Sequence, residues 1–322
     1  MGRRKKILFT DYFINLVDTY KLNQVGERTY NKYCLTHRHL KKICPDLYLQ
    51  DMNANDYQQI LNEFGKNHEK ATITDFHRQL AWTLKRAYNV DGLTDRDVTY
   101  DVQIPKGVVT NKKKPKFMEL DDMKKLVVTL KYLNSSYANF FLILLKTGLR
   151  FAELLGITLE DIDFEKKTIS INKTLDYKKG AYDENFSRRF KSTKNKYSVR
   201  TIPVDDAVIY MFWRNAKGAD KDESIFGSIK GFQYNSSLNN KLEQTCKCAG
   251  VPVITLHGLR HEHATYLVSQ GIDSRAVAER LGHVDDSVTR EVYIHRLETE
   301  RVRDNQQIMR SVSKIWQNLE NQ

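Results

Sequence analysis

The stretch best suited to chemistry is residues 256–295, which carries two histidines, an arginine and a tyrosine near predicted helix ends. Its apolar spacing predicts a helix that starts at Leu256 and is stopped by a glycine. His257 and Arg260 fall in the first turns of that helix, and residues three apart share one helix face. An imidazole and a guanidinium therefore lie on one helix face, where both can contact a bound anion.

A second predicted helix follows and supplies two more groups. It ends at Gly282, so His283 comes directly after a helix end, and Tyr293 lies ten residues further on. A tyrosine hydroxyl can attack a phosphorus atom, but with a pKa of about 10 it needs a base and a positive field. His257 can serve as that base, and His283 can hydrogen-bond the phosphate.

Another arginine lies more than a hundred residues earlier. Arg150 follows an apolar helix predicted over 137–146 and stopped by Gly148, and Glu153 comes three residues later. Attack on a phosphodiester puts extra charge on its non-bridging oxygens, which a metal-free site must neutralise with fixed cations. Arginine suits this task because its planar fork donates two bonds and stays protonated. Arg150 and Arg260 are thus candidates for holding a phosphate.

A lysine-bearing turn lies between the arginines. Alternating apolar and polar residues predict strands over 168–171 and 199–203, separated by a long basic segment. That segment ends in F-K-S-T-K-N-K-Y-S, a pattern typical of a hairpin turn carrying Lys194 and Lys196. A lysine there can protonate the leaving 5′ oxygen of a cut DNA strand as a general acid.

In this order the motifs resemble those of the tyrosine recombinase family, specifically phage-type integrases. The resemblance covers residues from about 117 to 300 and rests on T-G-L-R-F-A-E-L, S-T-K-N-K-Y-S-V-R-T-I-P, H-G-L-R-H, L-G-H and the tyrosine ten residues later. It implies a site-specific DNA recombinase that forms a 3′-phosphotyrosyl bond and needs no metal or other cofactor.

The resemblance also implies a role for each candidate residue. The catalytic set comprises six residues: Arg150, Lys194, His257, Arg260, His283 and Tyr293. The arginines would hold the phosphate, Tyr293 would attack it, and Glu153 would support the site. Lys194 is preferred over Lys196 as the general acid because it lies six residues before Arg200, close to the family's spacing.

The rest of the chain predicts the elements that carry this site. Four amphipathic helical stripes over residues 8–90 are typical of a compact bundle. We therefore expect a helical, SAM-like core-binding domain over 1–100, a basic linker over 101–117, and a catalytic domain with a C-terminal helix over 118–322. The expected fold class is mainly α with a small antiparallel β-sheet, and the resemblance implies that the two domains clamp around DNA.

The charge balance points to the partner. Lys and Arg outnumber Asp and Glu by 52 to 40, giving a net charge of +12, which favours double-stranded DNA; charge serving solubility alone is the alternative. The residues expected to contact phosphates are basic and clustered: Arg3, Arg4, Lys112, Lys113, Lys114, Lys116 and Lys196. An ordinary solvated terminus and linker remain the alternative for the first six.

Several classes of protein are excluded by the sequence. Four cysteines without a C-x-x-C pair argue against disulfides and zinc. The H-E-H at 261–263 lacks the zincin spacing because position 265 is threonine. Neither a signal peptide nor a membrane span is evident, so we expect a cytoplasmic protein without metal or membrane partner.

Further partners follow from the resemblance, and two other functions stay open. It implies a homotetramer on synapsed attachment-type sites of a phage or other mobile element, with possible accessory DNA-bending or excision factors. A small arm-binding domain usually comes first in phage-type integrases, whereas about seven residues precede the first predicted helix here. A non-catalytic DNA-binding regulator on the same scaffold and a type IB topoisomerase are the alternatives.

Overall fold

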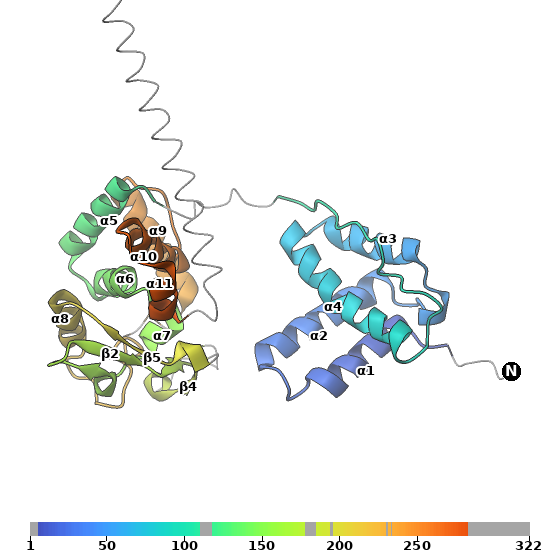
Figure 1. Cartoon of the computed structure of the whole chain (residues 1–322), viewed down its shortest axis with the longest axis horizontal. Coiled ribbons are helices and arrows are strands. Elements are labelled where there is room, and N and C mark those ends of the chain that lie inside the picture. The colour runs from blue at the N-terminus through green and yellow to red at the C-terminus, as the bar shows by residue number, and fades with distance from the viewer. Residues whose placement is uncertain are drawn as a thin grey trace, which may run out of the picture. The chain divides into compact units, whose positions relative to one another are not determined.

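The computed structural model describes residues 6–109, 118–177, 185–193, 196–229, 231–232 and 234–282 (Figure 1). The chain divides into two compact units, Met1–Lys113 and Lys114–Gln322. Several residues expected to act in the site or on DNA lie outside the described residues, as does the expected C-terminal helix: Arg3, Arg4, Lys112, Lys113, Lys114, Lys116, Lys194, His283 and Tyr293.

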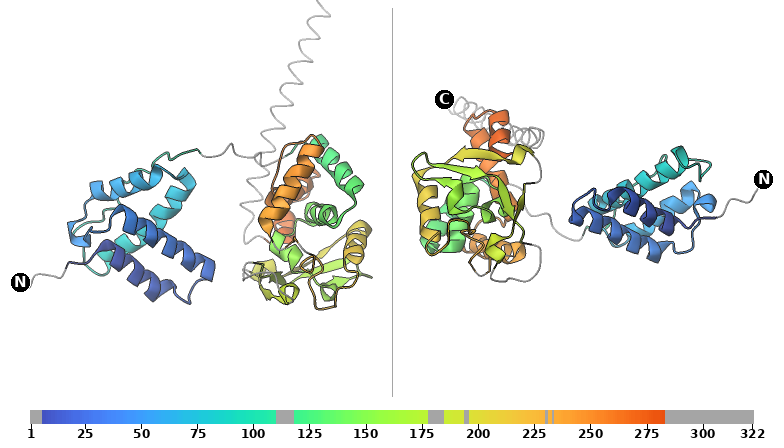
Figure 2. Two further views of the ribbon diagram at one scale, coloured as in Figure 1. Left: turned by 180° about the vertical axis from the view of Figure 1, so that it is seen from behind. Right: turned by 90° about the horizontal axis from the view of Figure 1, so that it is seen from below.

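The first unit is a helical bundle, as the sequence predicts (Figure 2). Its helices are α1 (Phe9–Lys21), α2 (Glu27–Ile43), α3 (Ala54–Gly65) and α4 (Lys70–Asn89), with a 3₁₀ turn η1 (Leu49–Asp51). Each helix turns an apolar stripe inward, and Phe13, Tyr57 and Phe76 are among the buried side chains. The stripe of α2 is the weakest, because Leu40 is buried while Tyr30 and Tyr33 are only half-buried.

Residues 101–109, the first part of the expected linker, lie against this bundle. The Gln103 backbone N–H donates to the Gln58 side chain over 3.0 Å, and the Gln58 amide donates back to the Gln103 carbonyl over 2.8 Å. The Val108 N–H donates to the His68 carbonyl over 3.0 Å. The described part of the expected linker is thus attached to the helical unit.

The second unit is built around one nearly buried helix, α6 (Ser136–Thr147), nine of whose twelve residues are buried. Its apolar composition on every face requires neighbours all round, and it contacts α5, α8, α9 and α10. The other α-helices among the described residues of this unit are α5 (Leu120–Leu133), α7 (Phe151–Leu155), α8 (Asp206–Asn215), α9 (Asn235–Cys248), α10 (Leu256–Ser269) and α11 (Ser274–Leu281).

The short strands of this unit gather at one end of it (Figures 1 and 2). The expected strands form as β2 (Thr168–Ile171) and β5 (Arg200–Pro203), which pair antiparallel with Ile169 opposite Ile202. The sequence predicted one small sheet, but the described residues form two. β1 (Ile162–Asp163) extends the first sheet, while β3 (Lys173–Leu175) and β4 (Phe190–Ser192) form the second.

The unpredicted strands are two or three residues long, too short to show an alternating pattern. The fold is therefore mainly α with small antiparallel sheets. Within the part of the chain that the structure describes, every helix falls short of the length and apolarity that crossing a membrane would require.

Candidate active site

Arg150 is positioned by the tight turn between α6 and α7. Gly148 ends α6 with a left-handed φ of 68°, and a Cβ there would lie 2.6 Å from the His263 ring, so only glycine fits. Arg150 is then the N-cap residue of α7. Its N–H donates to Glu153 Oε2 over 3.0 Å, and its Nη1 donates to Oε1 over 2.5 Å.

The Arg150 guanidinium also reaches two other elements. Nη2 donates to the carbonyl of Gly282, which follows α11, over 3.0 Å, and Nη1 lies 3.4 Å from Ser198 Oγ. The side chain nevertheless keeps 37% of its surface exposed. It is a cation that is held on one side and open to a ligand on the other.

Arg260 lies in α10 and is held differently. Its Nη1 donates to the Gly148 carbonyl over 2.7 Å and its Nη2 to the Leu281 carbonyl over 2.8 Å. These oxygens terminate α6 and α11, where the helix dipole is negative and favours a cation. Nη1 also lies 3.9 Å from Glu153 Oε2. Burial, and then the charge of Arg150, lower the pKa of Arg260 to about 9, so it remains protonated at neutral pH.

A third arginine, Arg200 at the start of β5, completes the cluster. Its Nη2 donates to Glu153 Oε2 over 3.0 Å, and only 8% of its side chain is exposed. The motif spacing alone does not identify Arg200 as a member of this cluster. A signal was available, because side chains two apart on a strand share a face and Ile202 is a core residue.

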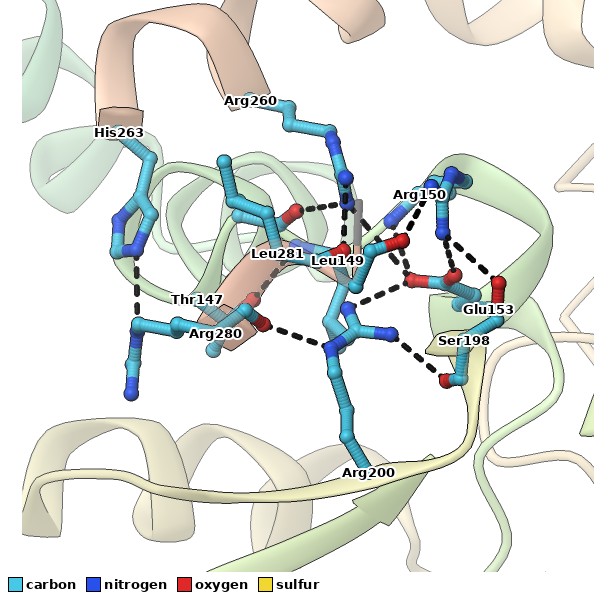
Figure 3. A network of polar contacts seen from close by, with 12 residues as sticks. Thr147, Leu149, Arg150, Glu153, Ser198, Arg200, Arg260, His263, Arg280 and Leu281 are labelled. Atoms are coloured by element: carbon cyan, nitrogen blue, oxygen red, sulfur yellow. Dashed lines mark hydrogen bonds and ion pairs between the residues drawn. The ribbon is translucent and has the colours of Figure 1, made fainter. Parts of the chain in front are cut away.

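Three guanidinium groups therefore surround one carboxylate (Figure 3). Burial alone would raise the pKa of Glu153, but the charges of Arg200 and then Arg150 outweigh it and hold that pKa below its ordinary value. With Glu153 ionised, the cluster keeps a formal surplus of two positive charges. An arriving anion such as a phosphate would relieve the repulsion between these cations.

His257 stands at the exposed start of α10. Its ring centroid lies 4.5 Å from that of His261, with the rings nearly perpendicular. Desolvation by the surrounding protein, followed by the charges of His261, Arg260 and Arg150, lowers the pKa of His257 to about 4. The imidazole is therefore neutral at physiological pH, and an anion bound beside it would raise this pKa and make the ring a stronger base.

His263, six residues along the same helix, is buried and serves the structure. Its Nε2 accepts from Arg280 Nε over 3.2 Å, so Nδ1 carries the proton and donates to the Leu145 carbonyl over 2.9 Å. Arg280 in turn donates to the Pro203 carbonyl over 3.1 Å. Burial, and then Arg280, lower the pKa of His263 to about 4. This pair connects α10 with α6, α11 and β5 beside the arginine cluster (Figure 3).

The structure thus brings together Arg150, Glu153 and Arg260, with His257 near enough to feel their charges. Lys196 begins a 3₁₀ turn, η4 (Lys196–Ser198), between β4 and β5. Gly282 touches Arg150 and directly precedes His283. The other expected site residues, Lys194, His283 and Tyr293, lie outside the described residues and their placement stays a prediction.

The chain is similar to known integrases in sequence. A sequence model of the phage integrase family matches residues 116–300. The tyrosine recombinase XerC-like protein of Caldanaerobacter subterraneus is 30% identical over 54% of this chain and 49% of its own length. The ICEBs1 integrase of Bacillus subtilis is 24% identical over 69% of this chain and 66% of its own. The Tn916 transposase of Enterococcus faecalis is 26% identical over 77% and 63%. The chain thus spans about half to two thirds of these relatives.

Solved structures show the same fold. A fragment of the Tn1549 transposon integrase, in complex with a circular intermediate DNA, superposes with a TM-score of 0.72 at 20% identity, covering 92% of this chain and 99% of that one. A lambda integrase dimer bound to a COC′ core site gives a TM-score of 0.63 at 15% identity, over 89% and 77%. The two-unit, mainly helical architecture is therefore shared with these proteins.

Proposed function

The chain belongs to the phage integrase family, and from this premise we propose that it is a site-specific DNA recombinase that cuts and rejoins double-stranded DNA. The observation that carries the proposal is the arginine cluster around Glu153, two of whose members stand at the family's arginine motifs. A surplus of buried or half-buried positive charge has no use in a fold core, whereas it stabilises the charge that develops on an attacked phosphate.

The reaction assigns one task to each group. The Tyr293 oxygen attacks the scissile phosphorus, a new P–O bond forms, and the bond to the 5′ oxygen breaks, leaving a 3′-phosphotyrosyl link. Lys194 supplies the proton that the leaving 5′ oxygen takes up, and the neutral His257 takes the proton of the tyrosine hydroxyl. His283 hydrogen-bonds the phosphate. Attack by the 5′ hydroxyl of another duplex reverses these steps and completes strand exchange.

Arg150 and Arg260 divide the work of holding the phosphate. Arg260 is fixed by two backbone carbonyls and supplies a rigid positive field. Arg150 keeps one side of its guanidinium exposed and can donate directly to a non-bridging oxygen. Because the phosphodiester energy is kept in the tyrosyl bond, the exchange requires neither a nucleotide nor a metal.

We propose the remaining assignments on the same basis. Residues 1–100 form a core-binding domain, residues 101–117 a basic linker, and residues 118–322 the catalytic domain. The substrate class is the attachment sites of mobile elements, as the names of the integrase and transposase relatives suggest. Four protomers would synapse two duplexes in the cytoplasm, with accessory DNA-bending or excision factors. The phosphate-contacting residues would be Arg3, Arg4, Lys112, Lys113, Lys114, Lys116 and Lys196.

Trapping the covalent intermediate tests the proposal. The chain is incubated in EDTA with an attachment-site-like duplex that is nicked beside the scissile phosphate, so that the released 5′ fragment diffuses away. Denaturing electrophoresis should reveal a protein–DNA adduct that is lost in Tyr293→Phe. Tyr266→Phe, which alters an exposed tyrosine on α10, is the control and should keep the adduct.

The outcomes separate the candidate functions. An adduct that persists in Tyr293→Phe removes Tyr293 as the nucleophile, and binding of DNA without an adduct favours the regulator. An adduct followed by relaxation of supercoiled DNA, without exchange between two duplexes, favours the topoisomerase.

A further inference from the structure

Arg200 joins three segments that the proposed reaction must keep in register. Its Nη2 donates to Glu153 Oε2 in α7, its Nε donates to the Arg280 carbonyl at the end of α11 over 2.6 Å, and its Nη1 donates to the Ser198 carbonyl over 2.9 Å. Ser198 belongs to the turn that follows the expected lysine. One side chain thus contacts the segments that lead to the general acid, the first arginine and the nucleophile.

The geometry argues against a direct role of Arg200 on DNA. All three of its guanidinium nitrogens donate to protein oxygens, and its side chain is almost fully covered. Arg150, by contrast, is more than a third exposed. Glu153 would lie between Arg200 and a phosphate bound by Arg150.

Arg200 and Arg150 share the same carboxylate. Arg150 takes Oε1 with its side chain and Oε2 with its backbone N–H, while Arg200 takes Oε2. A carboxylate held at one oxygen by a second cation cannot rotate freely, so the Arg150 guanidinium has one preferred position. Without Arg200, Glu153 would retain both bonds to Arg150 but lose the charged bond that holds Oε2 from the β5 side.

We propose that Arg200 is a positioning residue, which sets the location of Arg150 through Glu153 and fastens the lysine turn and the end of α11 to the same carboxylate. This inference rests on the proposed function, because its effect is on DNA cleavage. Errors of about 1 Å in the placement of a catalytic group can cost about a hundredfold in rate.

A neighbouring arginine provides a matched control. Arg280 also fastens β5 to the helices, since it donates to the Pro203 carbonyl and to His263, but its side-chain hydrogen bonds go to these two residues and not to Glu153 or Arg150. Arg200→Lys and Arg280→Lys both keep a positive charge and both lose a planar fork. They differ because the guanidinium of Arg200 binds the Glu153 carboxylate, whereas that of Arg280 does not.

The experiment measures single-turnover cleavage of the nicked duplex at saturating protein, together with the dissociation constant for the same DNA. Arg200→Lys should cleave about tenfold to a hundredfold more slowly than the wild type, with DNA affinity within about twofold. Arg280→Lys should cleave within about threefold of the wild type. Equal losses in the two variants would show that fastening β5 is what matters, and the proposal would be wrong.

A double-mutant cycle asks whether Arg200 acts through Arg150. Arg200→Lys is combined with Arg150→Lys, which changes a partly exposed side chain and should leave the fold intact. If Arg200 positions Arg150, its loss should cost less than about threefold once Arg150 is already altered. Additive losses would overturn the proposal.

Folding is checked by circular dichroism. Should Arg200→Lys fail to fold, Arg200→Gln replaces it, because it removes one of three mutually repelling cations and is expected to show the same slow cleavage. A wild-type chain that forms no adduct would refute the proposed function. A wild-type chain that cleaves, beside an equally fast Arg200→Lys, would refute this inference alone.

Discussion

The two motif arginines are held by opposite means, although they lie around one carboxylate. The Arg150 region, at the start of α7, depends mainly on charge: its guanidinium pairs with Glu153, donates to one backbone carbonyl, that of Gly282, and keeps more than a third of its surface exposed. The Arg260 region, in α10, depends on neutral hydrogen bonds, because its buried guanidinium donates to the carbonyls that end α6 and α11.

The supports behind them differ in the same way. Behind Arg150 lies the charged pair of Glu153 and Arg200, whereas behind Arg260 lies the neutral His263, which receives Arg280 and donates to α6. A cation held by charge can be moved by another charge, including that of a bound phosphate. A cation held by helix ends stays where the backbone puts it. The site thus combines one adaptable and one fixed cation, and the comparison can be tested from each side.

The largest effect should come from removing the shared charge. Glu153→Gln leaves three buried or half-buried cations without a counterion, and breaking a buried pair in this way typically costs about 3–5 kcal/mol. The free energy of unfolding, measured by urea denaturation, should fall by that amount. Sulfate should restore stability in this variant more than in the wild type, because an added anion replaces the missing charge.

A second buried carboxylate serves as the control for that prediction. Asp161 pairs with Lys173 over 2.5 Å in the same unit, and its ion pair involves none of the three arginines. Asp161→Asn should also destabilise the fold, but sulfate should not rescue it specifically. Equal rescue of both variants would contradict the idea that the Glu153 cluster is an anion site.

A smaller effect should separate the two arginines themselves. Arg260→Ala strips hydrogen bonds from two buried carbonyls, and we expect a loss of about 2–4 kcal/mol in the free energy of unfolding. Arg150→Ala removes a partly exposed ion pair and should cost less than about 1 kcal/mol. Both should lower the cleavage rate at least about a hundredfold. Equal stability losses in the two variants would remove the distinction between a fixed and an adaptable cation.

The sequence predicts the Arg150 region well because its determinants are local. Gly148 stops α6, Arg150 caps α7, and Glu153 returns to Arg150 three residues later. Long apolar stripes are also readable, so α6 was expected over 137–146 and is found as Ser136–Thr147. Such features depend on residues within one or two turns of each other.

The parts of the site that the sequence does not predict depend on contacts between residues far apart in the chain. Arg200 contacts Glu153, 47 residues away in the sequence, and Arg280, 80 residues away. No local sequence pattern predicts contacts between residues so far apart. The H-E-H at 261–263 lacks metal-site spacing in the sequence, but only the structure gives the partners of its His263, Leu145 and Arg280. The expected placements of Lys194 and Tyr293 come from the family resemblance, and they remain predictions.

The smallest effect is on the pH dependence of the free energy of unfolding. It distinguishes the neutral contacts of His263 from the charged pair of Glu153 and Arg200. The pKa of His263 is about 4 in the folded chain, below its ordinary value of 6.5. Between these values the unfolded chain binds the extra proton, so the stability that His263 contributes above pH 6.5 is lost as the pH falls toward 4. From pH 7.5 to 5.5 the loss should be about 1 kcal/mol.

His263→Gln can keep both hydrogen bonds without titrating. The difference in unfolding free energy between the wild type and His263→Gln should therefore shift by that amount over this range. Gln270→Ala, which alters an exposed, non-titratable residue at the end of the same helix, should leave the pH dependence of the wild type unchanged. An unchanged slope in His263→Gln would mean that α10 does not rely on a neutral imidazole.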